Sequence, residues 1–437
     1  MIRVLALTLL AFAPALRAGE PDWPALEKQA LELLRKYVQI PSVNPPADTR
    51  ATAALLKSTL ERYGIEATLY PSGPNGQTNL LARIAGRDRT KKPLLLMNHM
   101  DVVPVDRAAW TIDPFAALIR DGKLWGRGSL DMKSIGVQHL MALVALKQAG
   151  IVPQRDIVML STADEETDGI RGVRWMIANH YAEFDPEYVL DEGGFGTRDI
   201  LAPGKLVFGI SVGEKQTVWL RLRARGAAGH GSQPVPDNAN VILMHALERA
   251  MALPPSPPHP VVAEMIRQLG PLAHNRYSDA IQGNTVSLTT LTAGVGSPVK
   301  VNVIPSLSEA TLDCRLLPGV DKDRFIADMK ARINDPRVAV ELINSPVDAG
   351  VSDSRTPLFD AIRKAVLAAH PDAIVVPMLA PHGTDSVNLR KRGVVAYGLT
   401  PMVLDLEGAA MHGDAERVPV DEFLKGIHIM YGVVSAM

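Results

Sequence analysis

Apolar residues follow two different spacings in the first half of the chain. Between Pro24 and Pro41, and again over residues 49–63 and 134–149, they recur at the spacing of one helix face, which predicts three helices. Short continuous apolar runs predict buried strands at residues 80–84, 94–97, 157–161 and 188–190. Strands of this kind with helices between them predict an α/β fold with a mainly parallel sheet that is covered on both faces.

The pattern changes near residue 207. Residues 218–224 alternate between apolar and polar side chains, which is typical of an antiparallel strand with one exposed face. Further strands are predicted at 285–291, 307–316 and 338–342, and helices at 240–252 and 323–333. These elements predict an inserted α+β domain at residues 208–344, between the two parts of a main domain at 19–207 and 345–437.

Residues 1–18 have the pattern of a signal peptide. Arg3 precedes an apolar stretch from Val4 to Ala15, and small residues up to Ala18 offer cleavage positions. The stretch is shorter than the roughly 20 residues that span a bilayer, and a membrane anchor is the alternative. We expect cleavage, no stable membrane insertion afterwards, and a secreted or periplasmic protein.

Charge and cysteine content narrow the range of partners. The net charge is −1 and no long basic run occurs, so nucleic acid and acidic membrane surfaces are poor candidates and a small substrate is expected. Cys314 is the single cysteine of the 437 residues, so no intramolecular disulfide can form. Stability must therefore come from the packed core and any bound metal.

Acidic and histidine side chains follow the predicted strands. They are His99 and Asp101 after the second run, Glu165 and Glu166 after the third, Asp191 and Glu192 after the fourth, and Asp131 in a glycine-containing loop before a helix. Because ligands gather at the carboxyl ends of parallel strands, we expect a shared metal site there. His99 and Asp101 leave their strand on the same side, so the Asp101 carboxylate can fix the tautomer of His99. Each motif alone has an ordinary structural explanation, and their combination favours the metal site.

Five segments resemble the motifs of the M20 family of metallopeptidases, which includes aminoacylases and glutamate carboxypeptidases. They are residues 94–104, 126–133, 164–166 and 190–193 and the pair His412 and Glu416, in the order of the family. The resemblance covers nearly all of the chain after residue 18. It implies a mainly parallel zinc-exopeptidase catalytic domain with a ferredoxin-like inserted domain that acts as a lid or dimerisation domain, so a homodimer is expected.

The resemblance also implies two zinc ions bridged by Asp131. One ion would be completed by His99 and one acid of the pair Asp191 and Glu192, with Glu192 slightly favoured, and the other by Glu166 and His412. Nitrogen and oxygen ligands with open positions suit catalytic zinc. Manganese or cobalt could occupy such a site in vitro.

By the same resemblance, Glu165 is the expected general base on a water that bridges the metals. His230 is expected to reach the active site of the other subunit and to stabilise the tetrahedral oxyanion there. The expected substrate-binding residues are Asn302, Arg315, Gly383 and Thr384, and an arginine fork suits a carboxylate. The family often has a glycine where His382 stands; a metal-ligand role for His382 is the less favoured alternative.

These expectations favour a metallohydrolase that cleaves a C-terminal amide or peptide bond, as a carboxypeptidase, dipeptidase or N-acyl-amino-acid hydrolase does. The substrate would be a small peptide or an N-acyl amino acid. A two-metal aminopeptidase is the alternative. A catalytically inactive binding protein with this fold is less favoured, because every expected ligand and the general base are present.

Overall fold

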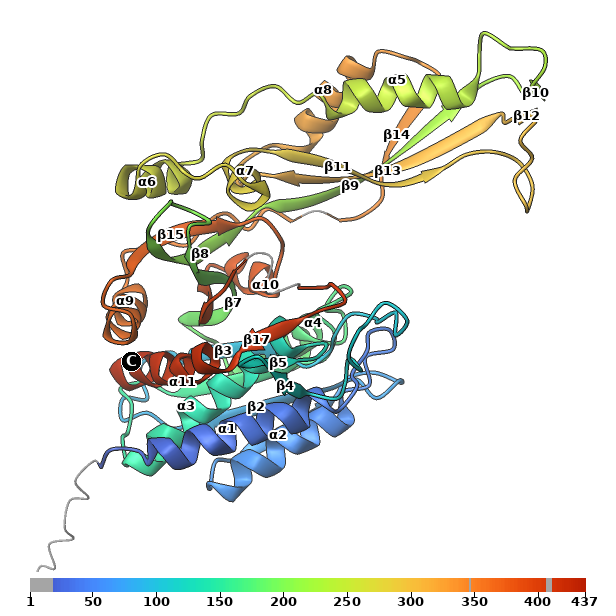
Figure 1. Cartoon of the computed structure of the whole chain (residues 1–437). Coiled ribbons are helices and arrows are strands. Elements are labelled where there is room, and N and C mark those ends of the chain that lie inside the picture. Colours follow the sequence, from blue (N-terminus) through green and yellow to red (C-terminus); the bar gives the residue numbers. More distant parts are fainter. Residues whose placement is uncertain (1–18, 346, 406–410) are drawn as a thin grey trace, which may run out of the picture.

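The computed structural model describes residues 19–345, 347–405 and 411–437. It consists of a large α/β body and a smaller elongated body whose strands extend away from it (Figure 1). The predicted signal peptide at residues 1–18 lies outside the described residues. Within those ranges, no helix is both long and apolar enough to cross a membrane.

The large body is built on an eight-stranded sheet. From one edge to the other, its strands are β1 (Ala67–Pro71), β2 (Thr78–Ile84), β6 (Ile157–Thr162), β3 (Leu94–His99), β7 (Tyr188–Arg198), β16 (Val395–Val403), β8 (Leu206–Glu214) and β15 (Ile374–Ala380). The pairs β6–β3, β3–β7, β7–β16 and β8–β15 are parallel. β1 and β2 are added at one edge by antiparallel pairing. The predicted mainly parallel sheet is therefore confirmed.

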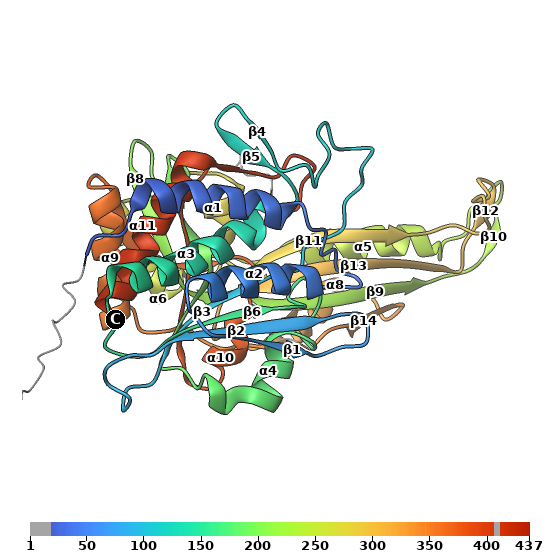
Figure 2. The same cartoon turned by 90° about the horizontal axis from the view of Figure 1, so that it is seen from below.

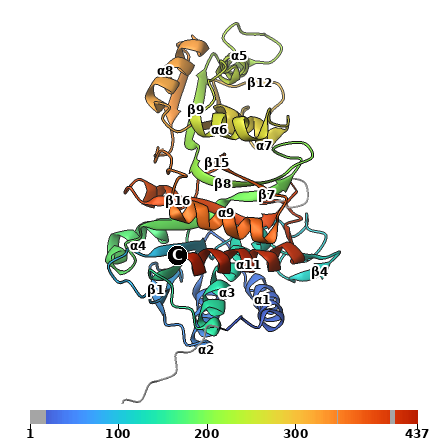
Figure 3. The ribbon, with the colours of Figure 1, turned by 90° about the vertical axis from the view of Figure 1, so that its left-hand side faces the viewer.

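Helices cover both faces of this sheet, as Figure 2 and Figure 3 show. One face is packed by α1 (Trp23–Val38), α2 (Arg50–Arg62), α3 (Ser134–Ala149), α9 (Pro357–Ala369) and α11 (Val420–Ala436), and the other by α4 (Val173–His180) and α10 (Ser386–Arg390). In β3, Leu94 and Leu96 join the first core, whereas Leu95 and Met97 join the second. This division explains why residues 94–97 form an uninterrupted apolar run.

The smaller body is an antiparallel sheet backed by helices. Its strands, in order, are β11 (Thr285–Thr292), β13 (Leu307–Leu316), β9 (Gln216–Arg225) and β14 (Val338–Leu342), and its helices are α5 (Ala239–Met251) and α8 (Lys322–Ile333). Every second residue of β9 is buried, as its alternating sequence predicts. At the far end of this body, β10 (Gly229–His230) pairs with β12 (Val303–Ile304) (Figure 1). We refer to β10, β12 and the loops that join them to this sheet as the tip.

β7 does not end before Asp191, contrary to the expectation from the sequence. It continues to Arg198, with Gly193 at a φ of 132°. A side chain on Gly194 would meet the carbonyl oxygens of Gly209 and Gly398, at 2.2 and 2.6 Å from its Cβ. The two glycines therefore permit a bend and a close approach of three strands, rather than a turn after the strand.

The first strand after residue 200 also differs from its expected place. β8 pairs with β15 and β16, so residues 206–214 belong to the large sheet, whereas the inserted domain was predicted to begin at residue 208. Two helices without a predicted counterpart, α6 (Pro260–Leu269) and α7 (Arg276–Gln282), return to the large body beside β15 (Figure 3). The start of α6 was concealed because it adjoins the proline-rich residues 254–260, which are typical of a loop, and α7 has only 7 residues.

Candidate metal centre and active site

His99, Asp131 and Glu192 come together at the carboxyl end of the parallel strands. His99 ends β3, Asp131 lies in an irregular turn at Ser129–Lys133, and Glu192 lies where β7 bends. Nε2 of His99 is 3.0 Å from Oδ1 of Asp131 and 3.7 Å from Oε1 of Glu192. One potential ligand atom from each of the three side chains lies within 4.8 Å of the others.

The other carboxylate oxygen of Asp131 faces a second group. Oδ2 of Asp131 is 2.9 Å from Nε2 of His412, and this nitrogen is 3.4 Å from Oε2 of Glu166. The His99 side chain is 1% exposed and that of His412 is 52% exposed, so the first group is enclosed while the second opens to solvent. A single carboxylate thus faces two histidine-containing groups, one with each oxygen.

The structure separates the neighbouring acids Asp191 and Glu192. Oδ2 of Asp191 accepts hydrogen bonds from the backbone N–H (3.1 Å) and the hydroxyl (2.8 Å) of Ser386. Successive residues of a strand point to opposite faces, so only one of the two acids can reach His99. Glu192 is the one beside His99 and Asp131, in agreement with the slight preference stated above.

Buried negative charge dominates the electrostatics of the two groups. Burial raises the pKa of Glu192 well above its usual value, and the charge of Asp131 raises it further. Burial opposes protonation of His99, but the hydrogen bond to Asp131 and the charge of Glu192 raise its pKa well above the usual value. Oε1 of Glu166 is buried without a hydrogen-bond partner within the described residues. A bound cation would neutralise this excess charge, so the donor set fits divalent metal ions.

Asp101 holds the turn that carries Glu165 and Glu166. Its carboxylate accepts the backbone N–H groups of Glu165 (3.2 Å) and Glu166 (3.1 Å) and the side-chain amide of Asn44 (2.8 Å). Nδ1 of His99 is 2.9 Å from the main-chain carbonyl oxygen of Asp101 but 3.7 Å from its carboxylate. The expected carboxylate contact to His99 is therefore corrected: the main chain of Asp101 holds the imidazole, and its side chain positions the glutamates.

Glu416 organises the loop that carries Asp131. One of its oxygens accepts the backbone N–H groups of Leu130 (2.9 Å) and Asp131 (3.1 Å), and the other accepts that of Gly128 (3.0 Å). Glu416 is fully buried and pairs with Arg127 at 2.6 Å. A small sheet of β4 (Leu118–Arg120), β5 (Lys123–Trp125) and β17 (Arg417–Pro419) brings it beside the loop. Glu416 belongs to one of the sequence motifs, but no role is predicted for it or for Arg127 from the sequence, because their contact joins residues 289 positions apart.

A cleft of about 430 Å³ adjoins the two groups. Its lining includes Glu165, Glu166, Lys215, Thr217, Arg315, His382, Gly383, Thr384 and His412. Arg315 donates to Asp313 through Nε (2.7 Å) and Nη2 (3.0 Å) and to Thr217 through Nη1 (2.8 Å). Within the described residues, these bonds use three of the five guanidinium N–H groups. Arg315 therefore lies at the cleft as one half of an ion pair with Asp313, with two N–H groups that make none of these bonds.

Two of the expected site residues are remote from this cleft in their own chain. His230 and Asn302 lie at the tip, where the backbone N–H of Gly231 donates to the carbonyl oxygen of Asn302 at 2.7 Å (Figure 1). The imidazole of His230 is exposed and contacts the hydroxyl of Ser232 at 2.7 Å. His382, in contrast, lines the cleft but is absent from both ligand groups found among the described residues.

A carboxylate shared by two histidine-containing groups beside an open cleft is the arrangement of a metallohydrolase. The chain matches the model of peptidase family M20/M25/M40 over residues 95–436, and it belongs to this family. Aminoacylase-1 of Mus musculus is 28% identical over 420 residues, which are 95% of this chain and 96% of the relative. Probable carboxypeptidase S-like 2 of Dictyostelium discoideum is also 28% identical, over 80% of this chain and 72% of the relative. The M20 family metallo-carboxypeptidase Sso-CP2 from Sulfolobus solfataricus has the same fold, with a TM-score of 0.71, 18% identity, and coverage of 93% of this chain and 98% of that one.

Proposed function

We propose that the protein is a two-metal hydrolase that releases a C-terminal amino acid from a small peptide or an N-acyl amino acid. The observation that carries this proposal is the position of Asp131 between His99 and His412, in the same site as Glu165. The names of the relatives, aminoacylase and carboxypeptidase, support this class of substrate.

Two sets of ligands share Asp131 in this proposal. The first set is His99, Asp131 and Glu192, and the second is Asp131, Glu166 and His412. Zinc is the proposed metal because three nitrogen or oxygen ligands with an open position suit it, and manganese or cobalt would replace it in vitro. When bound, the ions polarise the substrate carbonyl and lower the pKa of water.

Glu165 is the proposed general base. It lines the cleft, belongs to neither ligand set among the described residues, and has its backbone N–H held by Asp101. Its carboxylate would take a proton from the attacking water and return it to the amine nitrogen as the C–N bond breaks. Burial raises the pKa of Glu165 well above its usual value, and the charges of Asp385 and Glu166 add to this effect.

Arg315 would bind the free carboxylate of the substrate. Its remaining N–H groups offer the planar donor geometry that a carboxylate prefers. Gly383 and Thr384 line the same cleft and would contact the substrate beside it. Burial lowers the pKa of Lys215 to about 7, and its Nζ already donates to Ala280 and Thr285, so Lys215 supports the cleft wall rather than the substrate.

The tip would complete the site of a second subunit. His230 and Asn302 are both exposed, and both are remote from the cleft of their own chain. They would therefore contact a substrate only if two chains associate. We therefore propose a homodimer in which His230 stabilises the oxyanion in the partner's cleft. Export through cleavage after residue 18 is likewise proposed, from the sequence of residues 1–18 alone.

The proposal is tested by hydrolysis of matched substrates with zinc-loaded protein. N-acetyl-leucine and alanyl-leucine should be cleaved, whereas their C-terminal amides should react at least tenfold more slowly, because a neutral amide replaces the carboxylate that the remaining N–H groups of Arg315 would bind. Chelation should abolish both activities and zinc should restore them. Cleavage that requires a free amino group but tolerates the amide would identify an aminopeptidase instead, and no turnover of any substrate by zinc-loaded protein would favour a binding protein.

A further inference from the structure

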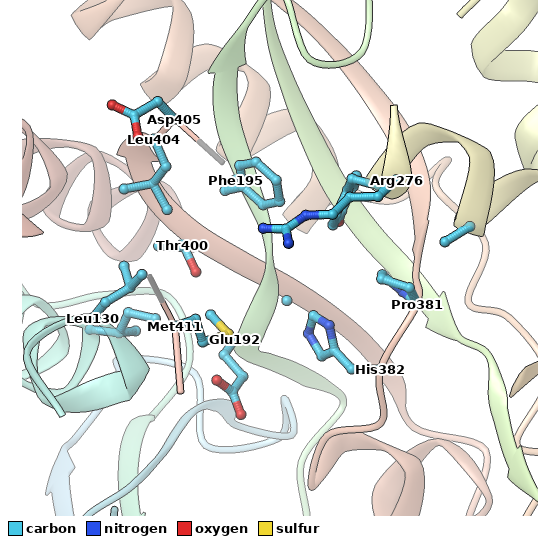
Figure 4. A pocket seen from close by; sticks show the side chains of 14 residues that line it. Leu130, Glu192, Phe195, Arg276, Pro381, His382, Thr400, Leu404, Asp405 and Met411 are labelled. Carbon is cyan, nitrogen blue, oxygen red and sulfur yellow. The ribbon is translucent and has the colours of Figure 1, made fainter. Parts of the chain in front are cut away.

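Trp219 is an exposed aromatic residue in the wall of the cleft. It lines the cleft together with Arg315 and is 43% exposed. Apart from two histidines, it is the only aromatic residue among the described lining residues. One of these histidines, His382, also lines a neighbouring cavity together with Glu192, as Figure 4 shows. A large indole that is exposed in the cleft wall is available to a molecule bound there.

The strand register places the indole beside Arg315. Thr217 of β9 lies opposite Arg315 of β13, and Trp219, two residues later, lies opposite Asp313. Side chains two residues apart on a strand project from the same face, about 7 Å apart. Arg315 extends toward the Trp219 side of this face, because its Nε and Nη2 both donate to Asp313. A group bound at the free edge of the guanidinium therefore lies within reach of the indole.

The backbone of Trp219 is held from both sides. Its N–H donates to Oδ1 of Asn344 (2.9 Å), and Nδ2 of the same amide donates to the carbonyl oxygen of Thr217 (3.0 Å). The carbonyl oxygen of Trp219 accepts the N–H of Ile343 (3.0 Å), a residue that is 37% exposed. The indole is therefore presented on a fixed backbone, with a second exposed apolar residue as its neighbour.

We propose that Trp219 selects the side chain of the released amino acid, and that the preferred amino acids are aromatic or large and apolar. This inference rests on the proposed hydrolytic function, in which Arg315 binds the carboxylate of that amino acid. The side chain on the adjacent Cα then lies beside the indole, where an aromatic ring gains both burial and a contact between rings. A cationic side chain would need the charge of Asp313, which is already paired with Arg315.

The experiment measures kcat and KM of the zinc-loaded protein for N-acetyl-alanine, -leucine, -phenylalanine and -lysine. In the wild type, kcat/KM for the phenylalanine substrate should exceed that for the alanine substrate at least tenfold. Trp219→Ala should raise KM for the phenylalanine substrate about tenfold and change kcat less than about twofold, because the contact is equally strong in the bound substrate and the transition state. Trp219→Phe should keep this KM within about threefold of the wild type.

Leu291→Ala is the matched control. It removes an exposed apolar side chain from β11 of the same sheet, outside the described lining of the cleft. It should leave the order of the four substrates unchanged. The molecular mass of each variant in solution, measured by light scattering, separates substrate binding from the association of chains.

Any of four results would overturn the inference. The wild type could cleave the alanine and phenylalanine substrates equally well, or Trp219→Ala could keep the wild-type order of substrates. A preference for the lysine substrate that Trp219→Ala loses would make the indole a site for cations. A Trp219→Ala protein that dissociates and loses activity equally on all four substrates would place Trp219 in an interface. Failure of the proposed function is recognised separately, because the zinc-loaded wild type would then hydrolyse none of the four.

Discussion

The metal centre and the tip are held in place in opposite ways. At the metal centre, Asp101 and Glu416 are both fully buried, and each accepts several backbone N–H groups from the segments that carry the proposed ligands. At the tip, His230 is exposed, and its imidazole contacts Ser232, only two residues away. The proposed metal ligands are thus held in position by buried hydrogen bonds within one chain. The tip, in contrast, is exposed, as expected of a surface that contacts a partner subunit. We therefore expect metal binding to be a property of one chain and full turnover to need two.

The largest expected effect separates chemistry from metal binding within the metal centre. Glu165→Gln keeps the size of the side chain but removes the base, so kcat should fall about 10³-fold while metal content is unchanged. Asp168→Asn, an exposed acid that lines the same cleft, is the matched control and should retain activity. The measurements are kcat and elemental analysis of the same preparations; loss of metal in Glu165→Gln would show that Glu165 is a ligand.

The second effect tests whether the tip acts on a partner. His230→Ala should lower kcat about 100-fold, because an oxyanion-stabilising donor is lost, and should leave metal content intact. His245→Ala, an exposed histidine of α5, is the control. Activity equal to that of the wild type would remove His230 from the mechanism.

Mixing the two inactive variants sharpens the same comparison. In a dimer of one Glu165→Gln chain and one His230→Ala chain, one of the two sites contains both Glu165 and His230. Refolding or prolonged exchange of an equimolar mixture should therefore restore up to about a quarter of wild-type activity if chains pair at random. If the mixture only averages the two variants, His230 acts within its own chain or not at all.

A smaller effect is expected from the residue that holds the Asp131 loop. Glu416→Gln keeps the shape of the side chain but loses the charge that faces Arg127 and three backbone N–H groups. The affinity for zinc should fall about 10- to 100-fold, as is usual when the support of a metal ligand is removed. Titration with a competing chelator measures this affinity, with Glu248→Gln on the exposed face of α5 as control. Unchanged affinity would show that the loop needs no such support.

The smallest effect concerns the stability of the metal-free protein. Burial raises the pKa of Asp385 to about 8, and the charge of Asp191 adds to this effect. The folded protein therefore holds this proton more tightly than the unfolded chain, and the resulting stability is complete below pH 4 and is lost as the pH rises toward 8. Asp385→Asn removes the titration, so its free energy of unfolding relative to wild type should increase by about 1–3 kcal/mol between pH 5 and pH 8. Chemical denaturation at both pH values measures the difference; a constant difference would contradict the raised pKa.

The regular parts of this fold are visible in the sequence because their side-chain periods are local. Residues 134–149, 307–316 and 338–342 were predicted with the limits that α3, β13 and β14 have in the structure. The residues that gather at the proposed metal centre were all named from the sequence: His99, Glu166 and Glu192 follow or lie within strands of the parallel sheet, whereas Asp131 and His412 were named through the resemblance of their motifs. The choice of Glu192 over Asp191 needed the structure, because it depends on which face of β7 turns toward His99.

What the sequence did not reveal depends on contacts between distant segments. The pair Arg127 and Glu416 forms only when β17 lies beside β5, and the role of the Asp101 side chain depends on where the turn at 164–166 passes. Helix α6 was missed because its first turn adjoins the proline-rich residues 254–260, which are typical of a loop, and α7 was missed because a helix of 7 residues gives little periodic signal. Tertiary placement, rather than local propensity, decides these features.

The central claim is that Asp131 links two metal sites within one chain, and zinc content measured on matched variants tests it most directly. Wild-type protein and His230→Ala should each bind about two zinc ions per chain after chelation, reconstitution and removal of excess metal, whereas Asp131→Ala should retain less than one. One zinc per wild-type chain, or an Asp131→Ala variant that still holds two, would contradict the shared site.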